Sequence, residues 1–310
     1  FHEDREPSFN IWPETQSFYC FGCGVGGDVF TFLEKVNSIS FPQAYELLQT
    51  GAVERRDIVI GRGTESYRRV GRGTLAQLDE EDKEILEAAT LLYHAQLMRS
   101  QSHQGLLARR GISLEMIKNF KVGWCNGKGL RGDLQKKRLS LARARRIGLL
   151  GEKGEHFRGR IVVPEIRKGH TLYLIGRAAR PGLKPKYLAL PLPKPLYGVG
   201  RIKRRDEVFV VEGVFDWMTL ASWGYPTVAL LGTRLGREGR SYLEKFERVY
   251  LVLDADEEGL LAANRIRREL GKRAKVVNLP IRVNDPNQLS RLEQGKELLA
   301  QAVAKAGSRH

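Results

Sequence analysis

The sequence has few cysteines and no long apolar segment. Its three cysteines, among 310 residues, do not make a disulfide framework, so a reducing, cytoplasmic setting fits best. The longest apolar runs, at residues 208–211 and 249–253, are far shorter than the roughly 20 residues of a membrane-spanning helix. No secretory signal opens the chain, whose first residue is Phe1. These absences favour an ordinary cytoplasmic protein without a membrane partner.

A phosphate-binding GxxxxGK[ST] loop is also absent, which excludes a fused helicase or ATPase motor within these residues. Acidic residues are in deficit, because 52 Lys and Arg outnumber 36 Asp and Glu to give a net charge of +16. A surplus of this size favours a polyanionic partner, first nucleic acid and then an anionic membrane. Charge alone leaves a generically basic protein open.

The pattern of residues changes several times along the chain. Residues 1–50 combine aromatics, a Cys-x-x-Cys pair and two amphipathic runs, whereas residues 51–78 are rich in Gly and Arg and repeat GRGT, as in a flexible basic linker. A helical period begins at Asp79, and mixed helices and strands follow to residue 205. Residues 206–285 form an α/β segment, and residues 286–310 are a short tail with one helix at 291–305.

The α/β segment alternates short apolar strands with helices. Strands are predicted at residues 208–211, 227–231, 249–253 and 275–279, and helices at 215–223, 240–246 and 258–270. Continuous apolar strands of this kind predict a parallel sheet covered on both faces. The fold class is therefore α/β in this segment.

Two of these strands run directly into acidic residues. Glu212 follows the first strand, and Asp254 and Asp256 follow the third. Functional groups gather at the carboxyl ends of parallel strands, so these carboxylates can converge. Oxygen ligands of this type select Mg²⁺ or Mn²⁺. The alternative for Asp256 is to cap the helix that follows.

These motifs resemble the Toprim domain of topoisomerases and primases, and in detail the bacterial-type DNA primases. The similar segments are VVEGVFDWMTLASWGYPTVALLGT (210–233), LDADEEGLLAANR (253–265), NDPNQL (284–289), FRGRIVVP (157–164), Gly176-Arg177 and KPKYL (184–188). The resemblance implies a small β zinc-ribbon domain at residues 1–50, a mixed α+β primase core subdomain at 79–205 and a Toprim catalytic domain at 206–285.

The resemblance also implies a set of catalytic acids, Glu212, Asp216, Asp254, Asp256 and Asp285, of which Glu212, Asp254 and Asp256 would hold Mg²⁺ or Mn²⁺. The alternatives are a solvated helix residue for Asp216 and an ordinary Asp-Pro turn for Asp285. Asn287 stands where the family often has a further acid, so that side of the site is expected to hold metal less strongly.

Ten Lys and Arg against three acids between residues 131 and 160 give this segment a net charge of +7. A phosphate-contacting surface and the solvated face of a helix are equally good interpretations of it. By resemblance, four basic residues bind nucleotide or template phosphates: Arg158, Arg160, Arg177 and Lys186.

The Cys-x-x-Cys pair, Cys20 and Cys23, would be half of a structural zinc site. The primase zinc ribbon has Cys-x-x-His, about seventeen residues, and then Cys-x-x-Cys, and His2 is in register with that pattern. The resemblance thus implies zinc bound by His2, Cys20 and Cys23, with a fourth ligand two residues before Phe1.

The implied function is that of a DNA primase, a nucleotidyltransferase that makes short RNA primers from NTPs on single-stranded DNA. A replicative helicase is a candidate partner, but the tail after Asp285 has no room for a dedicated helicase-binding domain. That feature favours a short primase of the phage or mobile-element type. The alternatives are a Toprim metal-dependent nuclease and a non-catalytic single-stranded DNA-binding protein.

Overall fold

The computed structural model describes residues 9–12, 16–20, 25–37, 39–50, 78–152 and 154–308. The chain divides into two compact units, Phe1–Gly71 and Arg72–His310, and each is described by itself. Except for Leu78, the predicted linker at 51–78 lies outside the described residues. Within the described part of the chain, no helix is long and apolar enough to cross a bilayer.

The first unit contains a small antiparallel sheet and two helices. The strands lie in the order β1-β2-β3, and the elements are β1 (Phe9–Trp12), β2 (Ser17–Cys20), β3 (Gly26–Asp28), α1 (Val29–Asn37) and α2 (Phe41–Thr50). The ring of Phe18 packs against those of Phe9 and Phe32, at centroid distances of 5.4 and 5.5 Å. Asp28 accepts a hydrogen bond from the backbone N–H of Thr31 (2.9 Å), which starts α1 directly after the sheet. The small β domain expected from the sequence is confirmed.

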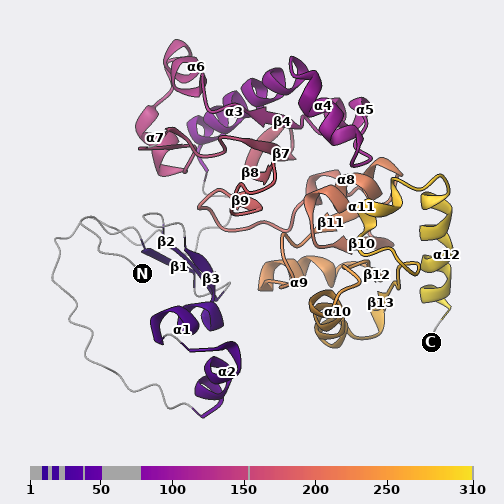
Figure 1. Ribbon diagram of the computed structural model, residues 1–310. Coiled ribbons are helices and arrows are strands. Elements are labelled where there is room, and N and C mark those ends of the chain that lie inside the picture. Colours follow the sequence, from indigo (N-terminus) through magenta and orange to yellow (C-terminus); the bar gives the residue numbers. More distant parts are fainter. Residues whose placement is uncertain are drawn as a thin grey trace. The chain divides into compact units, whose positions relative to one another are not determined.

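The second unit begins with a long helix against an antiparallel sheet (Figure 1). Asp79 caps the first helix by accepting the N–H of Asp82 (3.0 Å). The sheet has the strand order β4-β7-β8-β9, with β4 (Gly123–Cys125), β7 (Arg160–Arg167), β8 (His170–Ala178) and β9 (Tyr187–Ala189). The helices around it are α3 (Glu80–Met98), α4 (Gln101–Ala108), α5 (Leu114–Asn119), α6 (Leu130–Lys136) and α7 (Leu141–Arg146), and a two-stranded ribbon consists of β5 (Leu150–Gly151) and β6 (Gly154–Glu155).

A four-stranded parallel sheet follows, with the strand order β11-β10-β12-β13. Its strands are β10 (Glu207–Val211), β11 (Thr227–Ala229), β12 (Arg248–Leu251) and β13 (Ala274–Val276). The helical elements are η2 (Val199–Arg201), α8 (Val214–Ser222), α9 (Arg237–Leu243), α10 (Glu257–Leu270), η3 (Gly271–Arg273), α11 (Pro286–Leu289) and α12 (Gly295–Gly307). The predicted parallel sheet is thus confirmed.

Alternation along β10 explains why helices cover both faces of the parallel sheet. Val208 and Val210 belong to a buried cluster with side chains of α9 and α10, whereas Phe209 and Val211 belong to a cluster with side chains of α8 and α12. Successive side chains of a strand point to opposite faces, so both faces of β10 are apolar. This places the ends of the strands, where the acids lie, at an edge that neither helical layer covers.

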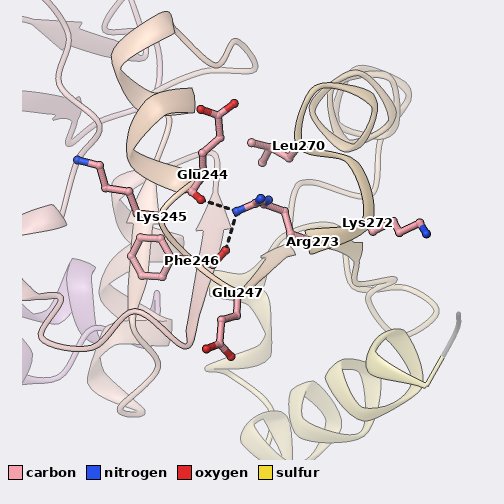
Figure 2. Close-up of a pocket in the computed structure, with 7 residues that line it drawn as sticks. All are labelled: Glu244, Lys245, Phe246, Glu247, Leu270, Lys272 and Arg273. Carbon is pink, nitrogen blue, oxygen red and sulfur yellow. Dashed lines mark hydrogen bonds between the residues drawn. The ribbon is translucent and has the colours of Figure 1, made fainter.

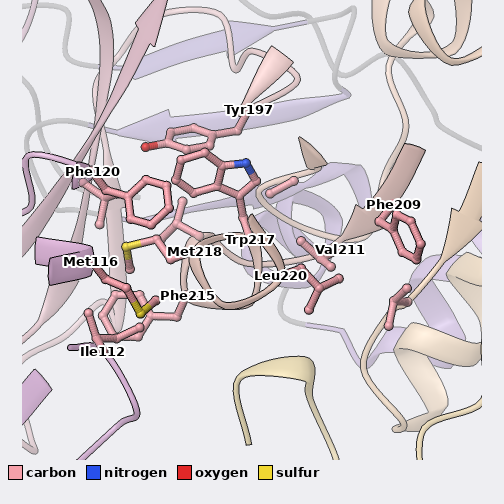
Figure 3. Packing of buried hydrophobic residues seen from close by; sticks show 14 of the residues in the cluster. Ile112, Met116, Phe120, Tyr197, Phe209, Val211, Phe215, Trp217, Met218 and Leu220 are labelled. Carbon is pink, nitrogen blue, oxygen red and sulfur yellow. The ribbon is translucent and has the colours of Figure 1, made fainter. Parts of the chain in front are cut away.

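One hydrophobic cluster joins the two sheets of the second unit (Figure 3). Trp217 of α8 packs edge-on against Phe120 (4.9 Å) and Tyr197 (5.0 Å), so that α8 is fixed against the end of α5. Gly198 has φ +86°, and a Cβ there would lie 2.0 Å from Trp217 Nε1, so this close approach requires glycine. Burying each large apolar side chain contributes about 1.5–3 kcal/mol, and the cluster therefore holds the antiparallel and parallel sheets in one body.

Candidate active site

Glu212 and Asp254 meet at the carboxyl end of the parallel sheet. β10 and β12 are neighbours with Val210 opposite Leu251, so the residues that follow the two strands come together. The backbone N–H of Asp254 donates to Glu212 Oε1 (3.1 Å). A Cβ at Gly259, in the first turn of α10, would lie 2.8 Å from the same oxygen. The glycine therefore leaves space for the Glu212 carboxylate beside the start of α10.

The electrostatics of this pair favour a cation. Burial raises the pKa of Glu212 to about 7, and the neighbouring carboxylates of Asp254 and Asp256 raise it further in the same direction. Burial likewise raises the pKa of Asp254 to about 6, with Asp285 and Asp256 as the next causes. Close carboxylates that hold their protons this strongly would release them to a bound divalent ion.

Asp216 lies on the first turn of α8 and is 8% exposed, so it is not the solvated helix residue that was its alternative. Its Oδ1 accepts the backbone N–H of Asn287 (2.9 Å). Burial raises the pKa of Asp216 to about 7, followed by the charges of Asp285 and Asp254. Asp216 therefore belongs to the same electrostatic cluster as Glu212 and Asp254.

Asp256 and Asp285 each cap a helix. Asp256 accepts the N–H of Gly259 (2.8 Å) at the start of α10, and Asp285 accepts the N–H of Gln288 (2.8 Å) at the start of α11. Capping, which was the alternative for Asp256, is therefore part of its local role. Both carboxylates also raise the pKa of Asp254, so capping does not separate them from the cluster.

The residues present fit a hard divalent cation that water and substrate oxygens complete. Among the described residues, no three His, Cys, Asp or Glu side chains are already gathered as a ligand set. Asp254 Oδ1, however, is a buried carboxylate oxygen without a hydrogen-bond donor. A buried acceptor of this kind requires a partner, and Mg²⁺ is typically bound through one or two carboxylates plus waters and phosphates. Glu212 and Asp254 provide that pair of carboxylates.

Two of the four basic candidates stand next to the acids. The guanidinium of Arg177 donates to the Tyr187 hydroxyl (2.7 Å) and lies over the Phe215 ring, 4.7 Å from its centroid. Lys186 is exposed, and its charge lowers the pKa of Asp254. The edge of the antiparallel sheet thus presents cations to the acid cluster.

The other two basic candidates differ from each other. Arg160 is only 5% exposed, and its guanidinium donates to the carbonyl oxygens of Arg158 (3.2 Å), Lys184 (3.3 Å) and Pro185 (3.1 Å). It holds the KPKYL segment from the inside rather than facing a groove. Arg158 is exposed, and its side chain crosses Gly127, where a Cβ would lie 2.5 Å from Arg158 Cγ.

Arg110 is a neighbour of the site that sequence reasoning missed. It lies between α4 and α5, and its pKa is lowered by burial, then by the charges of Arg177 and Arg291, whereas Asp285 has the opposite effect. Three arginines are therefore close enough to influence one another beside the acids. Nothing in the spacing of the Arg109-Arg110-Gly111 sequence indicates this position, because the turn reaches the site only through tertiary packing.

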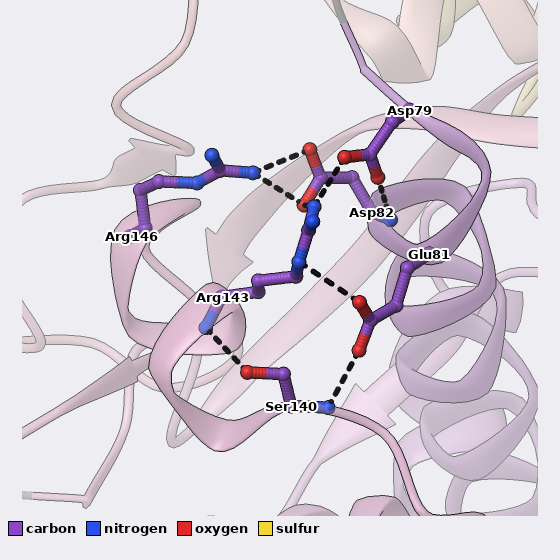
Figure 4. A network of polar contacts seen from close by, with 6 residues as sticks. All are labelled: Asp79, Glu81, Asp82, Ser140, Arg143 and Arg146. Atoms are coloured by element: carbon purple, nitrogen blue, oxygen red, sulfur yellow. Dashed lines mark hydrogen bonds and ion pairs between the residues drawn. The ribbon is translucent and has the colours of Figure 1, made fainter.

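Part of the basic segment at 131–160 is neutralised by α3 (Figure 4). Arg146 donates to both carboxylate oxygens of Asp82 (2.7 and 2.6 Å), and Arg143 pairs with Asp79, Asp82 and Glu81, the last at 2.9 Å. These two arginines fix α7 to α3, which neither interpretation of the segment anticipated. The exposed cations that remain for phosphate contacts are Arg131, Lys136, Arg138 and Arg145.

A surface hollow of about 550 Å³ lies between the end of α9 and η3 (Figure 2). Arg273 crosses it and donates to the carbonyl oxygens of Glu244 and Phe246. None of its lining residues belongs to the candidate site, and its two glutamates oppose its basic side chains. The hollow therefore does not indicate a ligand.

The expected zinc ligands are only partly described. Cys20 ends β2, is buried, and its backbone N–H donates to the carbonyl of Val25 (2.7 Å), which closes the turn between β2 and β3. His2 and Cys23 lie outside the described residues.

Three family models match the chain in succession: CHC2 zinc finger at residues 1–58, the N-terminal domain of the DNA primase catalytic core at 92–194, and Toprim-like at 209–290. A DNA primase of Geobacillus stearothermophilus is 30% identical over 97% of this chain, and one of Pseudomonas aeruginosa is 32% identical over 94%. A crystal structure of the zinc-binding and RNA polymerase domains of the Aquifex aeolicus primase covers 99% of this chain with 26% identity and a TM-score of 0.66, and 77% of that chain is matched. The chain spans about half of each of the two curated relatives, 54% and 47% of their lengths.

Proposed function

Since this chain belongs to the bacterial DNA primase family, we propose that it is a DNA primase that joins NTPs into short RNA primers on a single-stranded DNA template. The observation that carries the proposal is the acid cluster, in which Asp254 Oδ1 is buried without a donor beside Glu212. Opposite it stand Arg177 and Lys186, cations suited to phosphates. The reaction is a nucleotidyl transfer and needs no nucleophilic side chain.

Glu212 and Asp254 would hold Mg²⁺ or Mn²⁺, with Asp256, Asp216 and Asp285 around them. A bound divalent ion supplies polarisation of the α-phosphate and helps the attacking 3′-hydroxyl to ionise. The chain's own contribution is placement: Arg177 is held by Tyr187 and Phe215, so its guanidinium offers a fixed contact for a phosphate. Lys186 adds a mobile positive charge on the same side, and Arg158 extends the basic surface.

In the first unit, we place a structural zinc ion on His2, Cys20 and Cys23, with a fourth ligand before Phe1. Structural zinc is four-coordinate, and the unit would present template DNA to the second unit. Partners are then the DNA template, NTPs and a replicative helicase, and the setting is the cytoplasm.

Primer synthesis on single-stranded DNA with four NTPs and Mg²⁺ or Mn²⁺ tests the proposal. Glu212→Gln and Asp254→Asn should each reduce the rate by roughly 10²–10³-fold, because a metal ion stabilises transition-state charge by several kcal/mol. Glu257→Gln is the matched control, since this exposed acid on α10 does not contribute to the pKa shifts of the cluster, and it should keep wild-type synthesis. Full synthesis by Glu212→Gln and Asp254→Asn would sink the assignment.

The same reactions distinguish the two alternatives. Metal-dependent degradation of labelled single-stranded DNA without RNA synthesis would identify a nuclease. Salt-sensitive DNA binding without any metal-dependent product would identify a binding protein.

A further inference from the structure

Asn287 is buried at a junction of three parts of the second unit. It lies in α11, two residues after Asp285, and is 4% exposed. Its backbone N–H donates to Asp216 Oδ1 (2.9 Å). Its side-chain Nδ2 donates to the carbonyl oxygen of Arg110 (2.9 Å) and to Thr219 Oγ1 (3.0 Å), and it lies 3.5 Å from Ser290 Oγ. One residue thus contacts the acid cluster and the Arg110 turn at once.

A second observation shows how closely this turn is held against α11. Gly111 follows Arg110 and has φ +74°, and a Cβ there would lie 1.9 Å from Ser290 Oγ. No other residue fits such an approach, because a Cβ would clash and the backbone conformation disfavours side chains. Asn287 and Ser290 therefore form one side of a clasp, and Arg110 and Gly111 form the other.

We propose that Asn287 is a positioning residue that sets Arg110 relative to the acid cluster, and that it is not a metal-ligand position in which an acid has been lost. The inference rests on the proposed primase function and adds a residue to that site. Arg110 is placed among Arg177, Arg291 and Asp285, so its guanidinium is directed to the phosphates of a bound substrate.

The hydrogen-bond chemistry requires an amide at this position. Thr219 Oγ1 donates to the carbonyl of Phe215 (3.0 Å), so it offers Asn287 a lone pair. The Arg110 carbonyl oxygen is also only an acceptor. Aspartate would present carboxylate oxygens to the Arg110 carbonyl and to a hydroxyl whose proton is already donated, and it would add a charge beside Asp216. An unsatisfied buried acceptor of this kind is unfavourable.

The test compares Asn287→Asp and Asn287→Ala with wild type in two measurements, Mn²⁺ titration without nucleotide and primer synthesis over a range of NTP concentrations. If Asn287 positions Arg110, Asn287→Asp binds Mn²⁺ no more tightly than wild type and loses about tenfold or more in kcat/KM, mainly through KM. Asn287→Ala shows the same KM defect without the added charge. Tighter Mn²⁺ binding together with retained synthesis in Asn287→Asp would overturn the proposal.

A double-mutant cycle separates positioning from general stability. When Arg110→Ala is already present, adding Asn287→Ala should change kcat/KM by less than about twofold, because the group it positions is gone. Independent, multiplying losses would contradict the inference. Ser290→Ala is the matched control, since Ser290 contributes only the 3.5 Å contacts to Arg110 and Asn287 Nδ2 and a bond to the Asn287 carbonyl, and its KM should stay within about twofold of wild type.

Gly111→Ala approaches the same clasp without changing α11 and should reproduce the KM defect, so the test survives if an Asn287 variant fails to fold. Wild-type synthesis in the same assay judges the primase proposal. The Mn²⁺ titration needs no synthesis, so it judges Asn287 even if wild type makes no RNA.

Discussion

Two clusters of three acids in the second unit have opposite surroundings. Asp79, Glu81 and Asp82 on α3 are matched by Arg143 and Arg146 of α7, and Asp82 is buried at 2% exposure (Figure 4). For Glu212, Asp216 and Asp254, no side-chain ion pair within 4.0 Å occurs among the described residues. Instead their carboxylates raise one another's pKa.

The difference separates structural acids from functional ones. A buried carboxylate with an arginine partner is complete within the chain and joins two helices. A buried carboxylate beside other carboxylates is complete only when a cation arrives from solution. The two clusters should therefore respond differently to metal, substitution and pH.

Divalent metal should stabilise the second cluster alone. Mg²⁺ or Mn²⁺ at about 100 times its Kd should raise the free energy of unfolding by about 2.7 kcal/mol, because it binds the folded state. Thermal melts with and without metal measure the shift. Glu212→Gln should abolish it and Asp82→Asn should leave it intact; equal metal responses in both variants would remove the distinction.

Removing one acid from the first cluster should weaken the fold. Asp82→Asn should lower the free energy of unfolding by roughly 2 kcal/mol, between the values for exposed and fully buried pairs, because Asp82 is buried while Arg146 is 60% exposed. Denaturant titration measures the loss. Glu84→Gln, an exposed neighbour on α3, is the control and should change little.

The pH dependence should have opposite signs in the two clusters. Glu212 and Asp254 keep their protons to about pH 7 and 6 in the folded state but release them near pH 4 when unfolded, so metal-free stability falls as pH rises through this window. The pKa of Asp79 is lowered, chiefly by the Asp82 N–H and then by Arg143, so its contribution is present above its ordinary pKa and is lost as pH falls.

Denaturant titrations of metal-free protein between pH 4.5 and 7.5 check these signs. Glu212→Gln should reduce the fall in stability that wild type shows as pH rises. An unchanged pH profile in that variant would count against a repelling acid cluster.

Arg145 and Arg146 offer the smallest and most local comparison. Arg146 pairs with Asp82, whereas Arg145 is exposed on the same helix. Arg145→Ala should keep stability within about 0.5 kcal/mol and, if this face contacts phosphate, reduce the salt slope of DNA binding by about one. Arg146→Ala should instead lower stability and leave the salt slope unchanged, and the reverse pattern would assign the two arginines wrongly.

Local patterns carried much of the fold. Apolar strands ending in Glu212 and Asp254 predicted the parallel sheet and the meeting of these two acids, because strand alternation and parallel pairing are short-range rules. The predicted extent of each element differed by only a few residues from the structure, as for α10, expected at 258–270 and found at Glu257–Leu270.

The sequence by itself determined the kinds of domain, their order and the acids at the strand ends, since each depends on neighbours in the chain. Tertiary structure alone decided which charged side chains are neutralised and which are left for a ligand. Arg146 is neutralised by Asp82, 64 residues away, and Arg110 is held at the site by Asn287, 177 residues away. Such partnerships depend on how the helices pack, and a charge in the sequence does not reveal whether the fold supplies its counterion.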